Sequence, residues 1–69
     1  MDYTIDTQRI KRQRISNGMT LRDLGRIAGI SYVAVCNVES GKTLPHQKTI
    51  RKICEALEIP LNEIYRFSR

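Results

Sequence analysis

The chain has 69 residues, which is enough for one small domain with a marginal hydrophobic core and too few for a second domain. Hydrophobic residues make up 41% of it, which excludes a disordered tail, and 12 lysines and arginines against 7 acidic residues give a net charge of +5. A small basic domain favours a polyanionic partner, with nucleic acid the first to consider, although a solvated basic surface would have the same composition.

The N-terminal part of the chain is predicted to be an arm followed by a helix. Residues 1–7 show no hydrophobic periodicity, so this arm either packs on the domain or is loose. The pattern over 8–17 predicts a helix with Thr7 as its N-cap and Ile10 as the clearest inward-facing residue. The Asn-Gly pair at 17–18 ends it, since both residues tolerate the left-handed conformation of a helix C-terminus.

A second helix is predicted to begin at Thr20. Its hydroxyl can cap the helix, and Asp23 three residues later comes close to a capping box, although Glu or Gln is usual at that place. Leu24 and Ala28 are four residues apart and therefore share one face of the helix. Gly29 follows them and is predicted to end the helix.

A third helix is predicted over 32–40, with Ser31 as its N-cap and Gly41 at its end. Val35 and Val38 are three residues apart and are predicted to face inward. Because valine is a poor helix former, the packing of this face must hold the helix in place.

The last part of the chain predicts a loop over 42–45 and two more helices. A helix over 47–57 carries its apolar residues on one stripe, and a proline then separates it from a short fifth helix over 61–66, expected to bury Leu61 and Ile64. With five helices and no strand pattern, the sequence predicts an all-α fold. The stripe consists of Ile50, Ile53, Cys54 and Leu57.

Several classes of protein are not expected from this sequence. Cys36, Cys54 and His46 match no metal template, and one histidine without paired carboxylates or a phosphate loop does not predict an enzyme, a cofactor or a small-molecule ligand. The first residues contain no apolar leader, and no stretch is long enough to span a membrane. We therefore expect a cytoplasmic protein with reduced thiols and no membrane partner.

The two helices over 20–40 and the tight glycine turn between them form a specific pattern. The pattern extends to positions before and after these two helices. Its residues are Arg14, Gly18, Thr20, Leu24, Ala28, Gly29, Ser31, Val35, Glu39, Gly41, Pro45, Ile53, Ala56, Leu57 and Ile64. With these spacings, the segment over 10–65 resembles the Cro/CI-type (XRE) helix-turn-helix family. The resemblance implies a five-helix lambda-repressor-like DNA-binding domain over 8–67, whose third helix enters the major groove of double-stranded DNA.

The outward face of the predicted third helix consists of the positions that its valines leave open. These are Tyr32, Val33, Cys36 and Asn37. The resemblance implies base reading by the first two and by Asn37, whose amide can pair with adenine N6 and N7, while Val33 can touch a thymine methyl. Alternatively, Asn37 is a polar residue on a wet helix face, Tyr32 packs over the turn, and Cys36 is only a small residue rather than a redox sensor.

The resemblance also implies phosphate contacts on both sides of the third helix. The candidates are Thr20, Leu21, Arg22, Lys42 and Thr43. Family members commonly have glutamine in place of Leu21 and a polar reader in place of Val33, so Leu21, Tyr32 and Val33 are expected to form an unusually apolar surface. Gly25 stands where alanine is usual, at a cost of up to about 1 kcal/mol in helix propensity.

Two further groups of residues carry structural expectations. The resemblance implies an ion pair between Arg14 and Glu39, the alternative being two solvated surface charges. The aromatic end of the chain is predicted to form a homodimer interface through Ile64, Tyr65 and Phe67.

The sequence thus favours a DNA-binding transcriptional regulator, with a repressor that occupies operator DNA as a homodimer as the leading hypothesis. A protein-binding adaptor or anti-repressor that uses the Leu21, Tyr32 and Val33 surface is the alternative. An antitoxin of a mobile element is a third possibility, which overlaps with the first because many antitoxins bind their own promoter.

Overall fold

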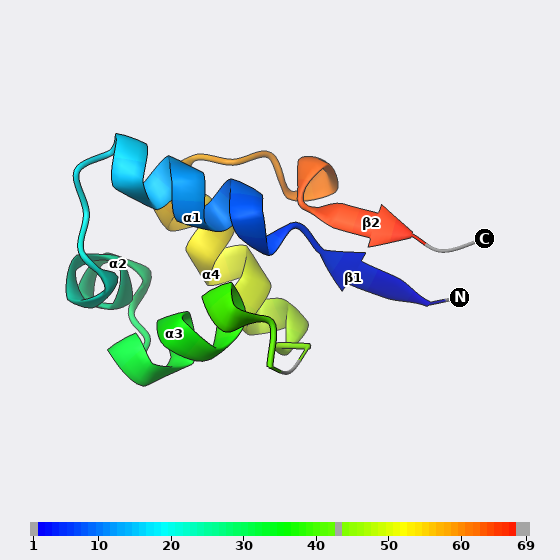
Figure 1. Ribbon diagram of the computed structural model, residues 1–69, viewed down its shortest axis with the longest axis horizontal. Coiled ribbons are helices and arrows are strands. Elements are labelled where there is room, and N and C mark those ends of the chain that lie inside the picture. The colour runs from blue at the N-terminus through cyan, green and yellow to red at the C-terminus, as the bar shows by residue number, and fades with distance from the viewer. Residues whose placement is uncertain (1, 43, 68–69) are drawn as a thin grey trace.

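The computed structural model describes residues 2–42 and 44–67. Within this part, four α-helices surround one core, and a two-stranded sheet lies beside them at one end of the domain (Figure 1). The helices and strands are β1 (Tyr3–Ile5), α1 (Thr7–Ser16), α2 (Leu21–Ala28), α3 (Tyr32–Ser40), α4 (Gln47–Leu57), the single 3-10 turn η1 (Leu61–Glu63) and β2 (Tyr65–Phe67). None of the described helices is both long and apolar enough to cross a membrane.

The helices α2 and α3 begin and end at the predicted residues because local capping groups fix both ends. The Thr20 hydroxyl accepts a hydrogen bond from the Asp23 N–H at 3.0 Å, and the Thr20 N–H donates to the Asp23 carboxylate at 2.9 Å, which completes a capping box. Ser31 Oγ caps α3 by accepting from the Ala34 N–H at 3.1 Å. Gly29 ends α2 in the left-handed conformation, with φ at 76°.

The helix α1 differs from its prediction at its N-terminus. Asp6 caps it, with Oδ1 accepting from the Arg9 N–H at 3.1 Å, and Thr7 is its first helical residue. Both residue types can cap a helix. Asp6 takes this role because its own N–H donates to the Ile64 carbonyl at 2.8 Å and its carboxylate pairs with Arg66 at 2.8 Å, so the C-terminal strand fixes its place.

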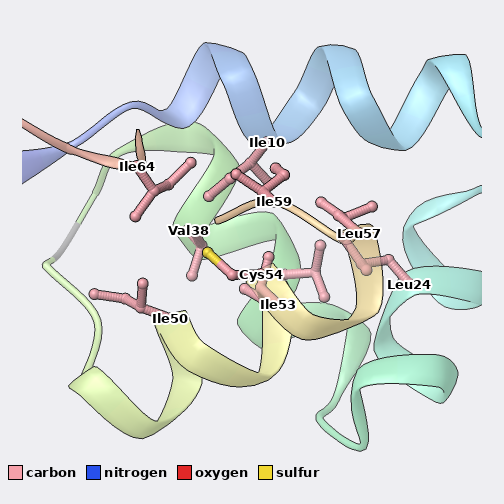
Figure 2. Packing of buried hydrophobic residues seen from close by; sticks show 10 residues of the cluster. Ile10, Leu24, Val38, Ile50, Ile53, Cys54, Leu57, Ile59 and Ile64 are labelled. Atoms are coloured by element: carbon pink, nitrogen blue, oxygen red, sulfur yellow. The ribbon is translucent and has the colours of Figure 1, made fainter. Parts of the chain in front are cut away.

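The core lies between the four helices and is built from one inward face of each (Figure 2). The apolar stripe of α4 is buried as predicted, and the valines at 35 and 38 of α3 pack against it. Ile59, after α4, and Ile64, after η1, complete the core. The buried residues are Ile10, Leu24, Val35, Val38, Ile50, Ile53, Cys54, Leu57, Ile59 and Ile64.

The expectation of an all-α fold with five helices is wrong at the two ends of the described chain. A single 3-10 turn and β2 replace the fifth helix, and the predicted arm contains the strand β1, which packs on the domain through Ile5. The strands pair antiparallel, with Tyr3 opposite Phe67 and Ile5 opposite Tyr65. Aromatic and β-branched residues favour this pairing, and the rings of Tyr3 and Tyr65 meet edge to face at 5.2 Å. Leu61, expected in the core, is 38% exposed.

Asp6 links the stability of the domain to pH. The hydrogen bond from the Arg9 N–H, helped by Arg66, lowers the pKa of Asp6 below the usual value of an aspartate side chain. A lowered carboxyl pKa stabilises the fold above the unfolded value, and this contribution is lost as pH falls through the folded value. We therefore expect the wild-type melting temperature to fall as the pH drops below about 4.

Two substitutions separate the cap of α1 from the charge of Asp6. Asp6→Ala removes both and should lower the free energy of unfolding by about 1 kcal/mol at pH 7. Asp6→Asn keeps a good N-cap but not the charge, so its melting temperature should depend less on pH between 5 and 3. Equal acid sensitivity of Asp6→Asn and wild type in thermal melts followed by circular dichroism would contradict the assignment.

Gly25 allows the start of α3 to approach α2 closely. A methyl group at this position would lie 2.9 Å from the Ile30 carbonyl oxygen and 3.2 Å from the Tyr32 nitrogen, both of them backbone atoms that cannot turn aside. The glycine that appears unfavourable by helix propensity therefore serves the packing of the turn.

We expect Gly25→Ala to lower the free energy of unfolding by about 1–2 kcal/mol, because the overpacking cost exceeds the gain in helix propensity. The exposed neighbour Arg26→Ala is the matched control and should change it by no more than about 0.5 kcal/mol. The measurement is urea denaturation of both variants. A Gly25→Ala protein more stable than wild type would show that the turn has room for the methyl group.

Candidate nucleic-acid interface

The helix α3 is anchored on one face and open on the other. Val35 is fully buried and Val38 is 4% exposed, whereas Val33 on the outer face is 52% exposed. Asn37, which lies on the same outer face, is also exposed. Cys36 is half-buried between the two faces, so it offers less surface than was expected of it.

The turn between α2 and α3 is held by its backbone. The N–H groups of Gly29 and Ile30 both donate to the Gly25 carbonyl oxygen, the latter at 2.9 Å. Together with the absence of a side chain at Gly25, these bonds fix the direction in which α3 leaves α2. The backbone of the turn therefore sets the position of the outer face of α3.

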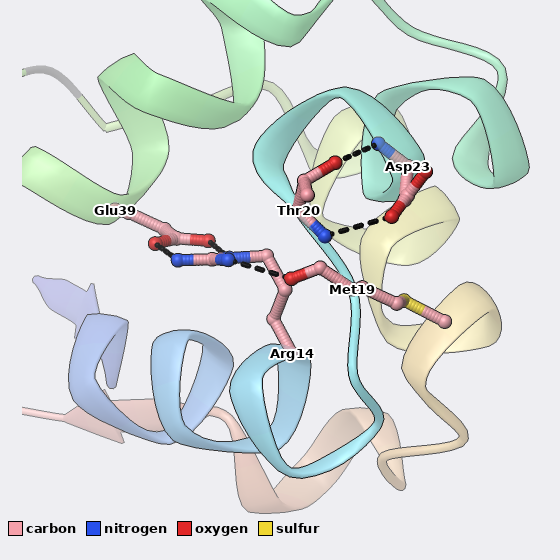
Figure 3. Close-up of polar contacts among 5 residues, drawn as sticks. All are labelled: Arg14, Met19, Thr20, Asp23 and Glu39. Atoms are coloured by element: carbon pink, nitrogen blue, oxygen red, sulfur yellow. Dashed lines mark hydrogen bonds and ion pairs between the residues drawn. The ribbon is translucent and has the colours of Figure 1, made fainter.

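Arg14 and Glu39 form a two-pronged ion pair that ties α3 to α1 (Figure 3). Arg14 Nε lies 2.7 Å from one oxygen of Glu39 and Nη2 lies 3.1 Å from the other, while Nη1 donates to the Met19 carbonyl at 2.8 Å. The two side chains are only 11% and 8% exposed. The hydrogen bonds that Arg14 donates to Glu39 raise the pKa of Arg14 above its usual value. This arrangement connects α1, the loop before α2, and α3.

The N-terminus of α2 is less open to a phosphate than the sequence suggests. The N–H and the hydroxyl of Thr20 are both engaged with Asp23 (Figure 3). These hydrogen bonds, the one from the Thr20 N–H first, lower the pKa of Asp23, so its carboxylate is charged at neutral pH. A negative charge therefore already lies at this helix end, and Thr20 stays a predicted phosphate contact through its hydroxyl proton alone.

The other phosphate candidates lie on both sides of α3. Arg22 is exposed on α2, and Lys42 is exposed just after the C-terminal end of α3. Thr43 lies outside the described residues. Leu21 is half-buried and packs against the core, so it has only its backbone to offer to a phosphate.

The expected apolar surface is smaller in the structure than in the prediction. Leu21 belongs to the rim of the core, and the ring of Tyr32, which is 40% exposed, lies under the Arg22 guanidinium. The distance from Arg22 Cζ to the ring centroid is 4.2 Å. Sequence analysis missed this contact because the two residues lie on different helices and meet only through the geometry of the turn.

The residues predicted for the homodimer interface divide into two groups. Ile64 is fully buried in the core, so the expectation that it contacts a partner is wrong. Tyr65 is half-buried, and Phe67 is 63% exposed, beside the rings of Tyr3 and Tyr65. Of the three residues predicted for this interface, Tyr65 and Phe67 therefore present surface to a partner.

The described part of the chain includes both cysteines and the histidine. It contains no group of three His, Cys, Asp or Glu side chains that could hold a metal ion. Cys36 and Cys54 are free thiols, and burial raises the pKa of Cys54. A raised thiol pKa disfavours the reactive thiolate, which is typical of a structural cysteine.

Two helices joined by a tight glycine turn, the second anchored by its inner face and open on its outer face, define a helix-turn-helix domain. The chain belongs to the helix-turn-helix family, whose model matches residues 10–64, and it is a domain of the Cro/CI type.

The proteins to which the chain is similar include a repressor of solved structure and a transcriptional regulator. The P22 c2 repressor, solved in complex with synthetic operator 9T in the presence of Tl+, superposes with a TM-score of 0.75 at 25% identity, over 81% of this chain and 85% of that one. Transcriptional regulator ClgR of Mycobacterium tuberculosis, in strains CDC 1551 / Oshkosh and H37Rv, is 31% identical over 55 residues, or 80% of this chain. The chain spans about half of that relative, since the match covers 49% of it.

Proposed function

We propose that this protein is a sequence-specific DNA-binding transcriptional regulator, and specifically a repressor that occupies operator DNA. The observation that carries the proposal is the outer face of α3, which the Arg14–Glu39 pair and the inner valines hold in a fixed position while Val33 and Asn37 stay exposed. The net charge of +5 favours a polyanion, and the P22 c2 repressor, to which the fold is similar, was solved in complex with a synthetic operator.

The chemistry of the exposed side chains fits the major groove. The Asn37 amide can donate to adenine N7 and accept from N6 in one bidentate pair, and the Val33 methyl groups can contact the methyl group of thymine. Lys42 can approach the phosphate backbone from the C-terminal end of α3. The proposal assigns no catalytic activity and no cofactor, and it places the protein in the cytoplasm, where free thiols stay reduced.

We further propose that the protein binds DNA as a homodimer, which would place two α3 helices about 34 Å apart on a near-palindromic site. The exposed Phe67 and its neighbour Tyr65 supply the candidate contact. We expect Phe67→Ser to shift the mass measured by light scattering toward the monomer. Ile15→Ser is the matched control, since Ile15 is 57% exposed on another element, and it should leave the mass unchanged. A wild-type monomer at all concentrations would refute this part of the proposal.

The proposal is tested by selection from a random pool of duplex DNA at about 150 mM salt, followed by sequencing of the retained fraction. Enrichment of a palindromic motif is the expected result. Retention without any motif, with steep loss as salt rises, would mean phosphate attraction alone and would contradict sequence-specific regulation. Retention of no duplex at all would favour the protein-binding alternative, through the Val33 side of α3.

A further inference from the structure

The guanidinium of Arg22 stacks on the ring of Tyr32, with Cζ 4.2 Å from the ring centroid. This distance is well within the range of a cation–π interaction. We propose that Tyr32 is a positioning residue for Arg22: its ring holds the guanidinium in place to bind a DNA phosphate. This inference rests on the proposed function, and it changes the role of Tyr32 from reading bases to strengthening binding regardless of base sequence.

The backbone brings the two side chains together. Arg22 is the second residue of α2 and Tyr32 is the first residue of α3, so each lies in the first turn of a capped helix. Between them, the turn is closed by the tight approach at Gly25, where a methyl group would lie 3.2 Å from the Tyr32 nitrogen. Because both helix starts are fixed, the stack is formed in advance of binding and little conformational entropy is lost on contact with DNA.

The charge of Arg22 remains available in this arrangement. Among the described residues, carboxylates pair with four other arginines, and the Asp23 carboxylate next to Arg22 is occupied by the Thr20 N–H and by Arg26. An aromatic ring attracts a cation without neutralising it, and stacking uses the face of the guanidinium. Its in-plane N–H groups can therefore still donate to two phosphate oxygens. The paired arginines are Arg9, Arg14, Arg26 and Arg66.

The position of the stack favours phosphate over base edges. In helix-turn-helix proteins the helix before the reading helix crosses the DNA backbone, and Arg22 lies at the start of that helix. With the guanidinium over its ring, Tyr32 has one face covered and is less able to stack on a base. Val33 is then the apolar residue of α3 that contacts bases, and Tyr32 acts on DNA through Arg22.

A double-mutant cycle tests the inference by measuring dissociation constants for the selected operator and for an unrelated duplex. Tyr32→Leu should weaken binding to both duplexes by the same factor, about two- to fivefold, the equivalent of one exposed cation–π contact. In an Arg22→Gln background it should cause no further loss. Tyr32→Phe keeps the ring and should bind like wild type. Arg22→Gln itself should reduce the slope of log affinity against log salt concentration by the amount expected for about one phosphate contact.

Arg26→Gln is the matched control, because Arg26 lies on the same helix but pairs with Asp23. In that background, Tyr32→Leu should keep its full cost, and the melting temperatures of all variants should be close to wild type because the residues are exposed. The inference is overturned if Tyr32→Leu changes the preferred base at one position, if its cost persists with Arg22→Gln, or if Tyr32→Phe binds as poorly as Tyr32→Leu. Those outcomes leave the proposed function standing, whereas a wild type that binds no duplex overturns both.

Discussion

Glu39→Ala is expected to destabilise the domain by about 3–5 kcal/mol, the usual cost of removing one partner of a buried ion pair. The substitution leaves Arg14, with only 11% of its side chain exposed, without the carboxylate that accepts two of its hydrogen bonds. A domain of 69 residues is stable by only about 3–10 kcal/mol in total. We therefore expect Glu39→Ala to be largely or partly unfolded at 25 °C, as measured by circular dichroism and urea denaturation.

A second pair in the same protein provides the control for this prediction. Arg9 and Glu63 also lie within 2.9 Å, but their side chains are 35% and 48% exposed. Arg9→Ala should therefore cost no more than about 1 kcal/mol. The double variant Arg14→Met/Glu39→Leu should recover much of the loss, because apolar side chains carry no buried charge. If Glu39→Ala and Arg9→Ala have equal melting temperatures, the buried pair does not stabilise the fold as argued.

Asn37→Ala is expected to have the largest effect on sequence recognition. Its exposed amide can donate to and accept from one adenine at the same time, and such a bidentate pair is worth about 1–3 kcal/mol of discrimination. We expect roughly 5- to 150-fold weaker binding to the selected operator, with preference relaxed at one base pair of each half-site. Binding to an unrelated duplex should be unchanged.

Lys42→Gln distinguishes base reading from phosphate contact in the same assay. Lys42 is exposed after α3, and its loss should weaken binding to all duplexes alike and reduce the slope of affinity against salt concentration. Isothermal titration or fluorescence anisotropy at two salt concentrations measures both effects. If Asn37→Ala instead weakens all duplexes equally, Asn37 does not read a base, and the reading surface of α3 must be assigned to other residues.

The sequence predicted the central helices well because their signals are local. The caps of α2 and α3 involve residues within three positions of each other, Thr20 with Asp23 and Ser31 with Ala34. The apolar stripe of α4 needs only the helical period to be recognised, and its members are buried. The family resemblance was carried by the same local pattern, together with the glycines that end the helices.

The terminal sheet could not be predicted in this way. A strand of three residues is stable only when a partner satisfies its backbone, and the partner of β1 is β2 at the other end of the sequence. The same long-range contact decided that Asp6 rather than Thr7 caps α1, since both residue types are good caps and only Asp6 is held by the C-terminal strand. The prediction of a fifth helix was wrong for the same reason, because the C-terminal residues form β2 by pairing with β1.

The candidate site shows the same division between local and long-range information. The sequence by itself determined which residue types lie on the outer face of α3, because the inward valines fix the rotation of the helix. The tertiary structure alone decided that Leu21 joins the core, that Gly25 is required for close packing, and that Arg22 meets Tyr32 across the turn. Each of these depends on the distance between two helices, and that distance is set by the packing of their backbones rather than by the sequence of either helix.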